Sequence, residues 1–268
     1  MGAYVKRVAQ IFGARVSMIH VFDTESHNGL ELYVRAPDEI AQEHEELARG
    51  RLESFLRSEF PASQCPRIVV SGDAASLIAL HAESGFDLII MPTHSGIFRR
   101  MLIGSLTAKV LNDVDCPVVT SEHAETVAPR PLTHRELLCA IGLGQNSERV
   151  LRYAHQLSSE IHANLSIVHA VQSFDSVAAD RPSGVEAQVS EQCRRAAEEI
   201  DALQKRVGSR ATARIVVGPI KQALLEAARH ADADVLVIGR GPQAGFHGRL
   251  RDLTYALVRD SPYPVLSI

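Results

Sequence analysis

Short apolar runs alternate with stretches of helical periodicity along most of the chain. In its second half, runs rich in Val, Ile and Leu stand at residues 136–143, 164–171, 213–217, 234–239 and 264–268. Between them, apolar residues recur at helical spacing over residues 147–162, 185–207, 220–230 and 249–260. Strands that are apolar on both faces and separated by helices are typical of a parallel sheet between two helix layers. The pattern predicts right-handed βαβ units in a doubly wound α/β sheet.

The first half of the chain repeats the second at a nearly constant distance. Tyr4 and Tyr153, which stand in similar segments, are 149 positions apart. Farther along, CPVVT at residues 116–120 matches YPVLS at residues 263–267, at a distance of 147 positions. Two nearly equal offsets over more than a hundred residues indicate a tandem duplication. Below, the counterpart of a residue is the residue aligned with it in the other copy, 149 positions away near the start of the first copy and 147 positions away farther along.

The duplication predicts two domains in tandem. We place the first domain at residues 1–122 and the second at residues 135–268. The segment between them, residues 123–134, is polar with two prolines and is interpreted as a linker. Five strands for each copy favour an open, flavodoxin-like sheet with helices on both faces. In such a sheet the ligand crevice lies at the carboxyl ends of the strands.

The first copy is expected to lack its first strand. Tyr4 corresponds to Tyr153, which already lies within a predicted helix, so the counterpart of residues 136–143 would precede residue 1. That strand is central in this topology, and its loss leaves a gap with unpaired backbone groups. We favour the interpretation that the real start lies upstream and that the sequence is truncated or its start misassigned. A second interpretation, in which another segment fills the gap, also stays open. The alternative is a structural loss that the second copy makes tolerable.

Composition excludes several classes of protein. The net charge of −4 gives no bulk attraction to nucleic acid or to an anionic membrane. No apolar run approaches the ~20 residues of a membrane span, and no signal peptide is visible at the N-terminus. The four cysteines, Cys65, Cys116, Cys139 and Cys193, are far apart and form no CxxC pair. We expect free thiols in a reducing cytoplasm and no metal site.

The segment between the predicted fourth strand and fourth helix of the first copy resembles a known family. DLIIMPTH, at residues 87–94, leads into GIFRRMLIGSLTAKVLNDVDCPVV, at residues 96–119. This stretch resembles the closing half of a universal stress protein domain, whose pattern is Gly-x2-Gly-x9-Gly-Ser/Thr followed by a Cys-Pro-Val-type final strand. The resemblance extends through both copies, including the segments that end in IHVF and VHAV. It implies an adenine-nucleotide-hydrolase-like sheet in each copy.

ATP-binding members of that family place adenine and ribose near an Asp after strand one and the triphosphate over the glycine loop. The resemblance therefore implies a degenerate ATP phosphate loop in the first copy, with Thr93, His94, Ser95, Gly96, Gly104, Ser105 and Thr107 as candidate binding residues. A Gly-Ser pair at a helix start offers free backbone N–H groups, a hydroxyl and the positive end of the helix dipole. Pro92 stands in place of the first glycine and has no N–H to donate. A turn and helix-cap role for Gly104 and Ser105 is favoured over phosphate binding, and both stay open.

The second copy departs from the pattern elsewhere. Gly239 is present, but Arg251 and Asp252 occupy the Gly-Ser position, and a carboxylate there repels phosphate. Gly142 stands where the family has its Asp after strand one, so we expect no cofactor in this copy. Arg240 is expected to be solvated or ion-paired rather than bound to an anion.

Two structural expectations concern the histidines and the longest helix of the first copy. His20 and His169 occupy the same place at the end of strand two, which favours a shared role such as a side-chain bond to a neighbouring loop. Residues 37–60 are expected to form one helix with a solvated charged face.

The function implied by the resemblance is that of a cytoplasmic, non-catalytic stress-response protein. It would act through contacts with an unidentified protein partner, with at most residual nucleotide binding. The alternative is an ATP-binding switch that uses the first-domain loop, and weak ATP hydrolysis stays open. The final strands, residues 117–120 and 264–267, are expected to pair, either between molecules or between the two copies of one chain.

Overall fold

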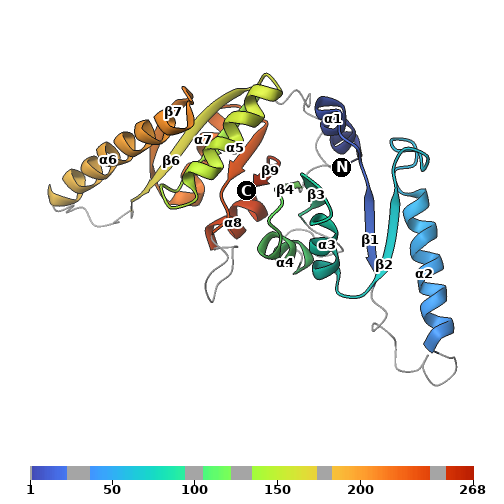
Figure 1. The fold of residues 1–268 in the computed structure, drawn as a ribbon. Coiled ribbons are helices and arrows are strands. Elements are labelled where there is room, and N and C mark those ends of the chain that lie inside the picture. The colour runs from blue at the N-terminus through green and yellow to red at the C-terminus, as the bar shows by residue number, and fades with distance from the viewer. Residues whose placement is uncertain (1, 23–36, 94–104, 122–134, 174–182, 242–251) are drawn as a thin grey trace.

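Strands and helices alternate through both copies, as the sequence pattern predicts (Figure 1). The computed structural model describes residues 2–22, 37–93, 105–121, 135–173, 183–241 and 252–268. The elements of the first copy are α1 (Gly2–Phe12), β1 (Met18–Phe22), α2 (Pro37–Ser54), β2 (Arg67–Ser71), α3 (Ala74–Ala82), β3 (Ile89–Pro92), α4 (Ser105–Asp113) and β4 (Val118–Ser121). Those of the second are β5 (Glu136–Ala140), α5 (Ser147–Glu160), β6 (Asn164–Gln172), α6 (Ser183–Val207), β7 (Thr212–Gly218), α7 (Ile220–His230), β8 (Val235–Ile238), α8 (Asp252–Asp260) and β9 (Val265–Ser267).

The second copy is a five-stranded parallel unit with the strand order β9-β8-β5-β6-β7. Its central strand β5 pairs with β6 on one side and with β8 on the other, and Leu137, Leu138 and Cys139 of β5 are almost completely buried. Apolar residues of α5 and α6 form one core with the sheet, and those of α7 and α8 form another. Helices therefore cover both faces, which confirms the predicted α/β class.

The first copy does not form a continuous sheet within the described residues. Its β1 pairs in parallel with β2 in a separate two-stranded sheet, and β3 pairs in parallel with β4. The counterparts of β1 and β3 are β6 and β8, which are joined in the second copy by β5. In the described part of the chain no strand joins β1 to β3.

The two copies are joined by their final strands. β4 and β9 pair antiparallel with the register Val118↔Ser267, Val119↔Leu266 and Thr120↔Val265, so that one sheet of seven strands runs from β3 to β7. Val119 lies opposite Leu266, which is its own counterpart. A residue can face its own counterpart only on a local twofold axis, so the two copies are related here as in a symmetric dimer.

Side-chain bonds across this pair follow the same symmetry. The Thr120 hydroxyl donates to the carbonyl oxygen of Val265 at 3.5 Å, and the Ser267 hydroxyl donates to that of Val118 at 3.2 Å. Thr120 is the counterpart of Ser267, and Val118 is the counterpart of Val265. Each copy therefore gives the other the same contact, which is the property of an isologous interface.

Arg240 links the second copy to the end of a first-copy helix, which corrects the expectation of a solvated or ion-paired role. Its side chain is buried, and its guanidinium donates to the carbonyl oxygens of Leu111, Val114 and Cys116 at 2.8–2.9 Å. The last carbonyls of a helix have no partner within the helix, and a cation there also complements the helix dipole. Arg240 thus completes the C-terminus of α4 from the other copy.

The longest helix of the first copy is shorter than predicted. It ends at Ser54, and Leu56 adopts the left-handed conformation with φ of 50° that commonly ends helices. The Arg67 guanidinium donates to the carbonyl oxygens of Phe55 at 2.8 Å and Phe60 at 2.9 Å, which fixes the chain beyond the helix. The helical pattern of the sequence therefore extends beyond Ser54, but tertiary hydrogen bonds hold the chain there in another conformation.

His169 makes the type of bond expected for the repeated histidines, whereas His20 does not make it within the described residues. The His169 Nδ1 donates to the carbonyl oxygen of Ile141, directly after β5, at 2.7 Å. His20 is exposed, and the strand that would supply its acceptor is the one that the first copy lacks in the described part of the chain.

We expect Arg240→Met to destabilise the protein by about 3 kcal/mol, because three carbonyl groups in and directly after the last turn of α4 lose a charged donor. The measurement is the urea midpoint by circular dichroism. Arg149→Met is the matched control, because Arg149 also donates across the copies but makes one bond of 3.3 Å from an exposed position. Equal midpoints for the two variants would contradict the role given to Arg240.

The histidine pair supplies a second prediction. His169→Ala should lower the free energy of unfolding by about 1 kcal/mol, because a hydrogen bond to the Ile141 carbonyl is lost. His20→Ala should change it by less than about 0.5 kcal/mol, as expected for an exposed residue without a special role. Urea titrations of both variants test this, and a loss for His20→Ala equal to that for His169→Ala would refute it.

Candidate functional site

The predicted crevice edge of the first copy is only partly described. Of the seven candidate residues, His94, Ser95, Gly96 and Gly104 lie outside the described residues, whereas Thr93, Ser105 and Thr107 lie within them. Ser105 is the first residue of α4 and is exposed. Its position offers a hydroxyl and a helix N-terminus to solvent, which suits an anion.

Thr107 and Thr93 turn toward the interior of the molecule. The buried Thr107 hydroxyl donates to the carbonyl oxygen of Pro92 at 3.1 Å, which ties α4 to the end of β3. Its counterpart Thr254 is also buried, in the copy that has no Gly-Ser pair. Thr93 is 1 % exposed, and its hydroxyl has no hydrogen-bond partner among the described residues. Of the described candidates, Ser105 is therefore the one open to solvent.

Asp73 is a charged residue near this edge that the sequence analysis did not single out. It follows β2 and caps α3, where it accepts hydrogen bonds from the Ser76 amide at 2.9 Å and the Ser76 hydroxyl at 2.7 Å. These bonds, with Lys109 at 3.5 Å, hold the pKa of the Asp73 carboxyl below its usual range. Gly-Asp directly after a strand is a helix-start signal and could have identified it.

At the corresponding edge of the second copy, described residues bond to one another. The Asn146 amide, in the turn before α5, donates to the Arg240 carbonyl oxygen at 2.8 Å, so the ends of β5 and β8 are tied together. Leu143 in the same turn has φ of 52°, a conformation that a side chain rarely adopts. A Cβ placed on Gly239 would lie 2.9 Å from Val150 Cγ2. Close packing against Val150 therefore explains why position 239 is a glycine, without any contact to phosphate.

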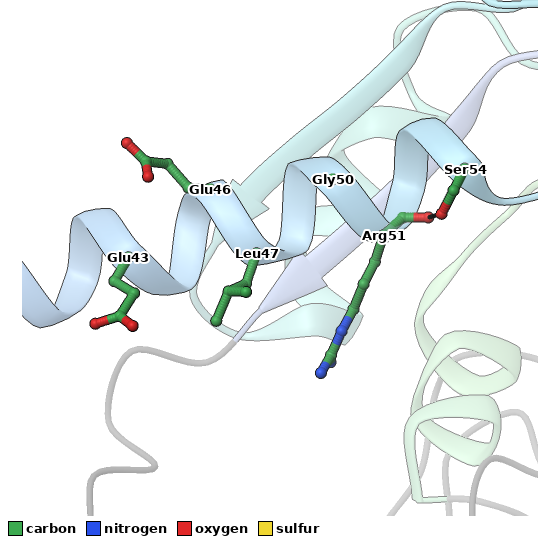
Figure 2. Close-up of a pocket in the computed structure, with 6 residues that line it drawn as sticks. All are labelled: Glu43, Glu46, Leu47, Gly50, Arg51 and Ser54. Carbon is green, nitrogen blue, oxygen red and sulfur yellow. Dashed lines mark hydrogen bonds between the residues drawn. The ribbon is translucent and has the colours of Figure 1, made fainter.

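A surface hollow of about 540 Å³ lies away from these strand ends. Of the described residues, those that line it all belong to α2: Glu43, Glu46, Leu47, Gly50, Arg51 and Ser54. Figure 2 shows these residues along the length of α2, with Glu46 pointing away from Leu47 and Arg51, and a hydrogen bond from the Ser54 hydroxyl to the Arg51 carbonyl oxygen. Leu47 is 53 % exposed. An open helix side without a buried polar group does not make a binding site.

Metal and thiol chemistry find little support in the described residues. No group of three His, Cys, Asp or Glu side chains suited to a metal ion occurs among them. Burial raises the pKa of the Cys139 thiol to about 12 and that of Cys116 above its usual value, so both are poor nucleophiles.

None of the helices in the described part of the chain is both long enough and apolar enough to cross a membrane.

Comparison with solved structures finds the same fold in two proteins that match nearly the whole chain, and a third protein matches one half of it. A universal stress protein from Archaeoglobus fulgidus DSM 4304 matches 99 % of this chain and 91 % of its own, with 20 % identity and a TM-score of 0.66. A putative universal stress protein from Pseudomonas aeruginosa UCBPP-PA14 matches 97 % of this chain and 94 % of its own, with 21 % identity and a TM-score of 0.57. The Archaeoglobus fulgidus universal stress protein in complex with dAMP matches 51 % of this chain and 98 % of its own, with 17 % identity and a TM-score of 0.38.

No curated protein matches the chain. A family model does, and it matches twice. The model described as the Universal stress protein family covers residues 3–121 and again residues 133–268. These two segments leave only residues 1–2 and 122–132 outside the match. The chain therefore belongs to the universal stress protein family, as a tandem member with two copies of the domain.

Proposed function

We propose that this chain is a non-catalytic stress-response protein that acts through protein contacts, with at most residual nucleotide binding. The proposal rests on the hydrogen bonds that polar groups at the two crevice edges make to other protein groups. In the second copy, protein groups tie the strand ends together, with Asn146 bonded to the Arg240 carbonyl. In the first copy, the hydroxyl of Thr107 is directed to the Pro92 carbonyl rather than to solvent.

The absence of an adenine-side anchor supports the same proposal. In the second copy Gly142 stands where the family has an Asp, and it has no side chain to hold a ribose. A nucleotide held only by its phosphates at one helix N-terminus would bind weakly, because screening by salt limits such contacts.

An ATP-binding switch is the second candidate function, and Ser105 favours it. This residue keeps the Gly-Ser/Thr position of the family pattern and is exposed at the start of α4. Distant members of the family bind nucleotides, among them proteins solved with cAMP and with dAMP. A switch would require the residues at 94–104 to complete the phosphate contacts that Pro92 lacks.

Calorimetric titration distinguishes the two functions. We expect ATP with Mg²⁺, cAMP and dAMP each to bind more weakly than about 1 mM, which corresponds to about 4 kcal/mol of binding free energy. The titrations use the full chain at physiological salt.

Ser105→Ala is the control that tests the switch. If ATP binds in the micromolar range and Ser105→Ala weakens it at least tenfold, the phosphate loop of the first copy works and the proposed function is wrong. Binding that Ser105→Ala does not change would place a nucleotide outside this loop, which would also contradict the proposal.

A further inference from the structure

β7 is the last strand of the seven-stranded sheet, and its outer edge has no partner strand among the described residues. The amide of Ser173, directly after β6, donates to the carbonyl oxygen of Gly218, so the backbone of Gly218 faces β6. Successive residues of a strand direct their backbone groups to opposite sides, so those of Val217, Ile215 and Ala213 face the open edge. Val217 is also 47 % exposed. The edge is therefore a partly apolar template for one more strand.

The chain around this edge is basic and carries no acidic residue. Residues 202–225 include five Lys or Arg and no Asp or Glu, although the net charge of the protein is −4. Two of the five pair with acidic residues outside this stretch, Arg206 with Glu148 at 3.2 Å and Lys221 with Asp260 at 2.8 Å. The other three are exposed and make no ion pair within the described part of the chain: Lys205, Arg210 and Arg214.

Arg214 lies on a different face of its sheet from its identical counterpart Arg67. Arg67 lies opposite Met18 in β1, and its guanidinium donates to three carbonyl groups in and beyond the last turn of α2. Arg214 lies opposite Val168, whose counterpart is Ile19, so the register of β7 differs by one residue. A shift of one residue turns a side chain to the other face of a sheet. Arg214 therefore lies on the face that α7 covers, away from α6, and it is exposed.

We infer that the open edge of β7 binds an extended acidic segment of a partner protein as an added antiparallel strand. This inference rests on the proposed function and deepens it, because it names the class of protein partner. Backbone hydrogen bonds would join the segment to the edge, and antiparallel pairs are slightly more stable than parallel ones. A carboxylate beside an exposed guanidinium can accept two parallel hydrogen bonds from it.

The order of residues along β7 sets the order of residues in the segment. Its apolar residues come first, opposite Val217 and Ile215. Its carboxylates come later, opposite Arg214 and Arg210, because the segment runs against the direction of β7. A nucleic acid suits the edge less well, because residues 202–225 include no aromatic side chain on which a base could stack.

The synthetic peptide acetyl-Val-Thr-Val-Glu-Thr-Glu-Ser-Glu-amide tests the inference. Labelled peptide is titrated with the full chain by fluorescence anisotropy, and we expect a dissociation constant on the order of 100 μM. A peptide with an N-methyl group on its second valine keeps its charge but cannot donate to the Ile215 carbonyl, so it should bind about tenfold more weakly. A peptide with lysine in place of each glutamate should not bind, because like charges would then meet.

Variants of the chain locate the bound peptide. Arg214→Glu should weaken binding about tenfold, because the acidic segment would meet a like charge. Arg15→Glu is the matched control, because it makes the same change at an exposed arginine of the first copy, and it should leave binding unchanged. Val217→Pro removes an outward amide without removing a bond to β6, so it should weaken binding about fivefold. The urea midpoint of each variant checks its fold.

Hydrogen exchange locates the bound peptide independently. The amides of the open β7 edge should exchange about fivefold more slowly at about 1 mM peptide. The edge of β2 is the comparison. The Met18 amide donates to the Pro66 carbonyl, so the residues of β2 that face outward are those that alternate with it. They are Arg67, Val69 and Ser71, and their exchange should stay unchanged, because the arginine of this edge is bonded within its own copy.

Absence of binding, binding that the N-methyl group does not weaken, or protection at β2 rather than β7 would overturn the inference. A single-stranded DNA oligonucleotide that binds more tightly than the peptide, and that needs Arg214, would overturn it as well. If Val217→Pro lowers the urea midpoint, the N-methylated peptide decides. If the peptide and nucleotides both fail to bind, the inference is wrong while the proposed function stands. If ATP binds through Ser105, the proposed function is wrong whatever the peptide does.

Discussion

The antiparallel pairing of β4 with β9 is the constraint on which the arrangement of the two copies depends. Val119 lies opposite its own counterpart Leu266, so the pairing places a local twofold axis inside one chain. Three register pairs would be a weak contact by themselves. The reciprocal hydroxyl bonds and the buried Arg240 guanidinium add directional contacts that a slip by one residue would break. The final strands therefore set both the symmetry and the register.

This pairing makes the first copy depend on the second. Within the described residues β3 and β4 have no continuous sheet of their own, but through β9 they belong to the seven-stranded sheet. Apolar residues of α3, α4, α7 and α8 pack in one core that spans both copies. Only β1, β2 and α2 stand apart from that sheet, joined through helix contacts. Burial against the second copy thus stabilises the described part of the first copy, in which no strand joins β1 to β3.

The sequence predicted what depends on local pattern and on duplication, and it missed what depends on tertiary contact. Apolar runs and helical spacing located the strands and helices, because burial on both faces leaves a clear signature in composition. They extended α2 past Ser54, where a left-handed Leu56 and the distant Arg67 end the helix. Arg240 was misjudged for the same reason, since its three acceptors lie more than a hundred positions away. Of the candidate site, only Thr93, Ser105 and Thr107 lie among the described residues.

The two copies differ in which family features they keep, and this difference shows which residues belong to the fold and which to the nucleotide site of the family pattern. The second copy has β5 but neither the family's Asp nor its Gly-Ser pair, whereas the first copy has Gly104 and Ser105 but no counterpart of β5 among the described residues. What both copies share is the buried threonine of the fourth helix and the hydroxyl residue of the last strand, Thr120 or Ser267. In the first copy Thr107 bonds the helix to the strand, and Thr120 and Ser267 bond one copy to the other. Among the described residues, the contacts that recur in both halves are those of the paired final strands, as expected when a duplication preserves the surface on which its two copies assemble.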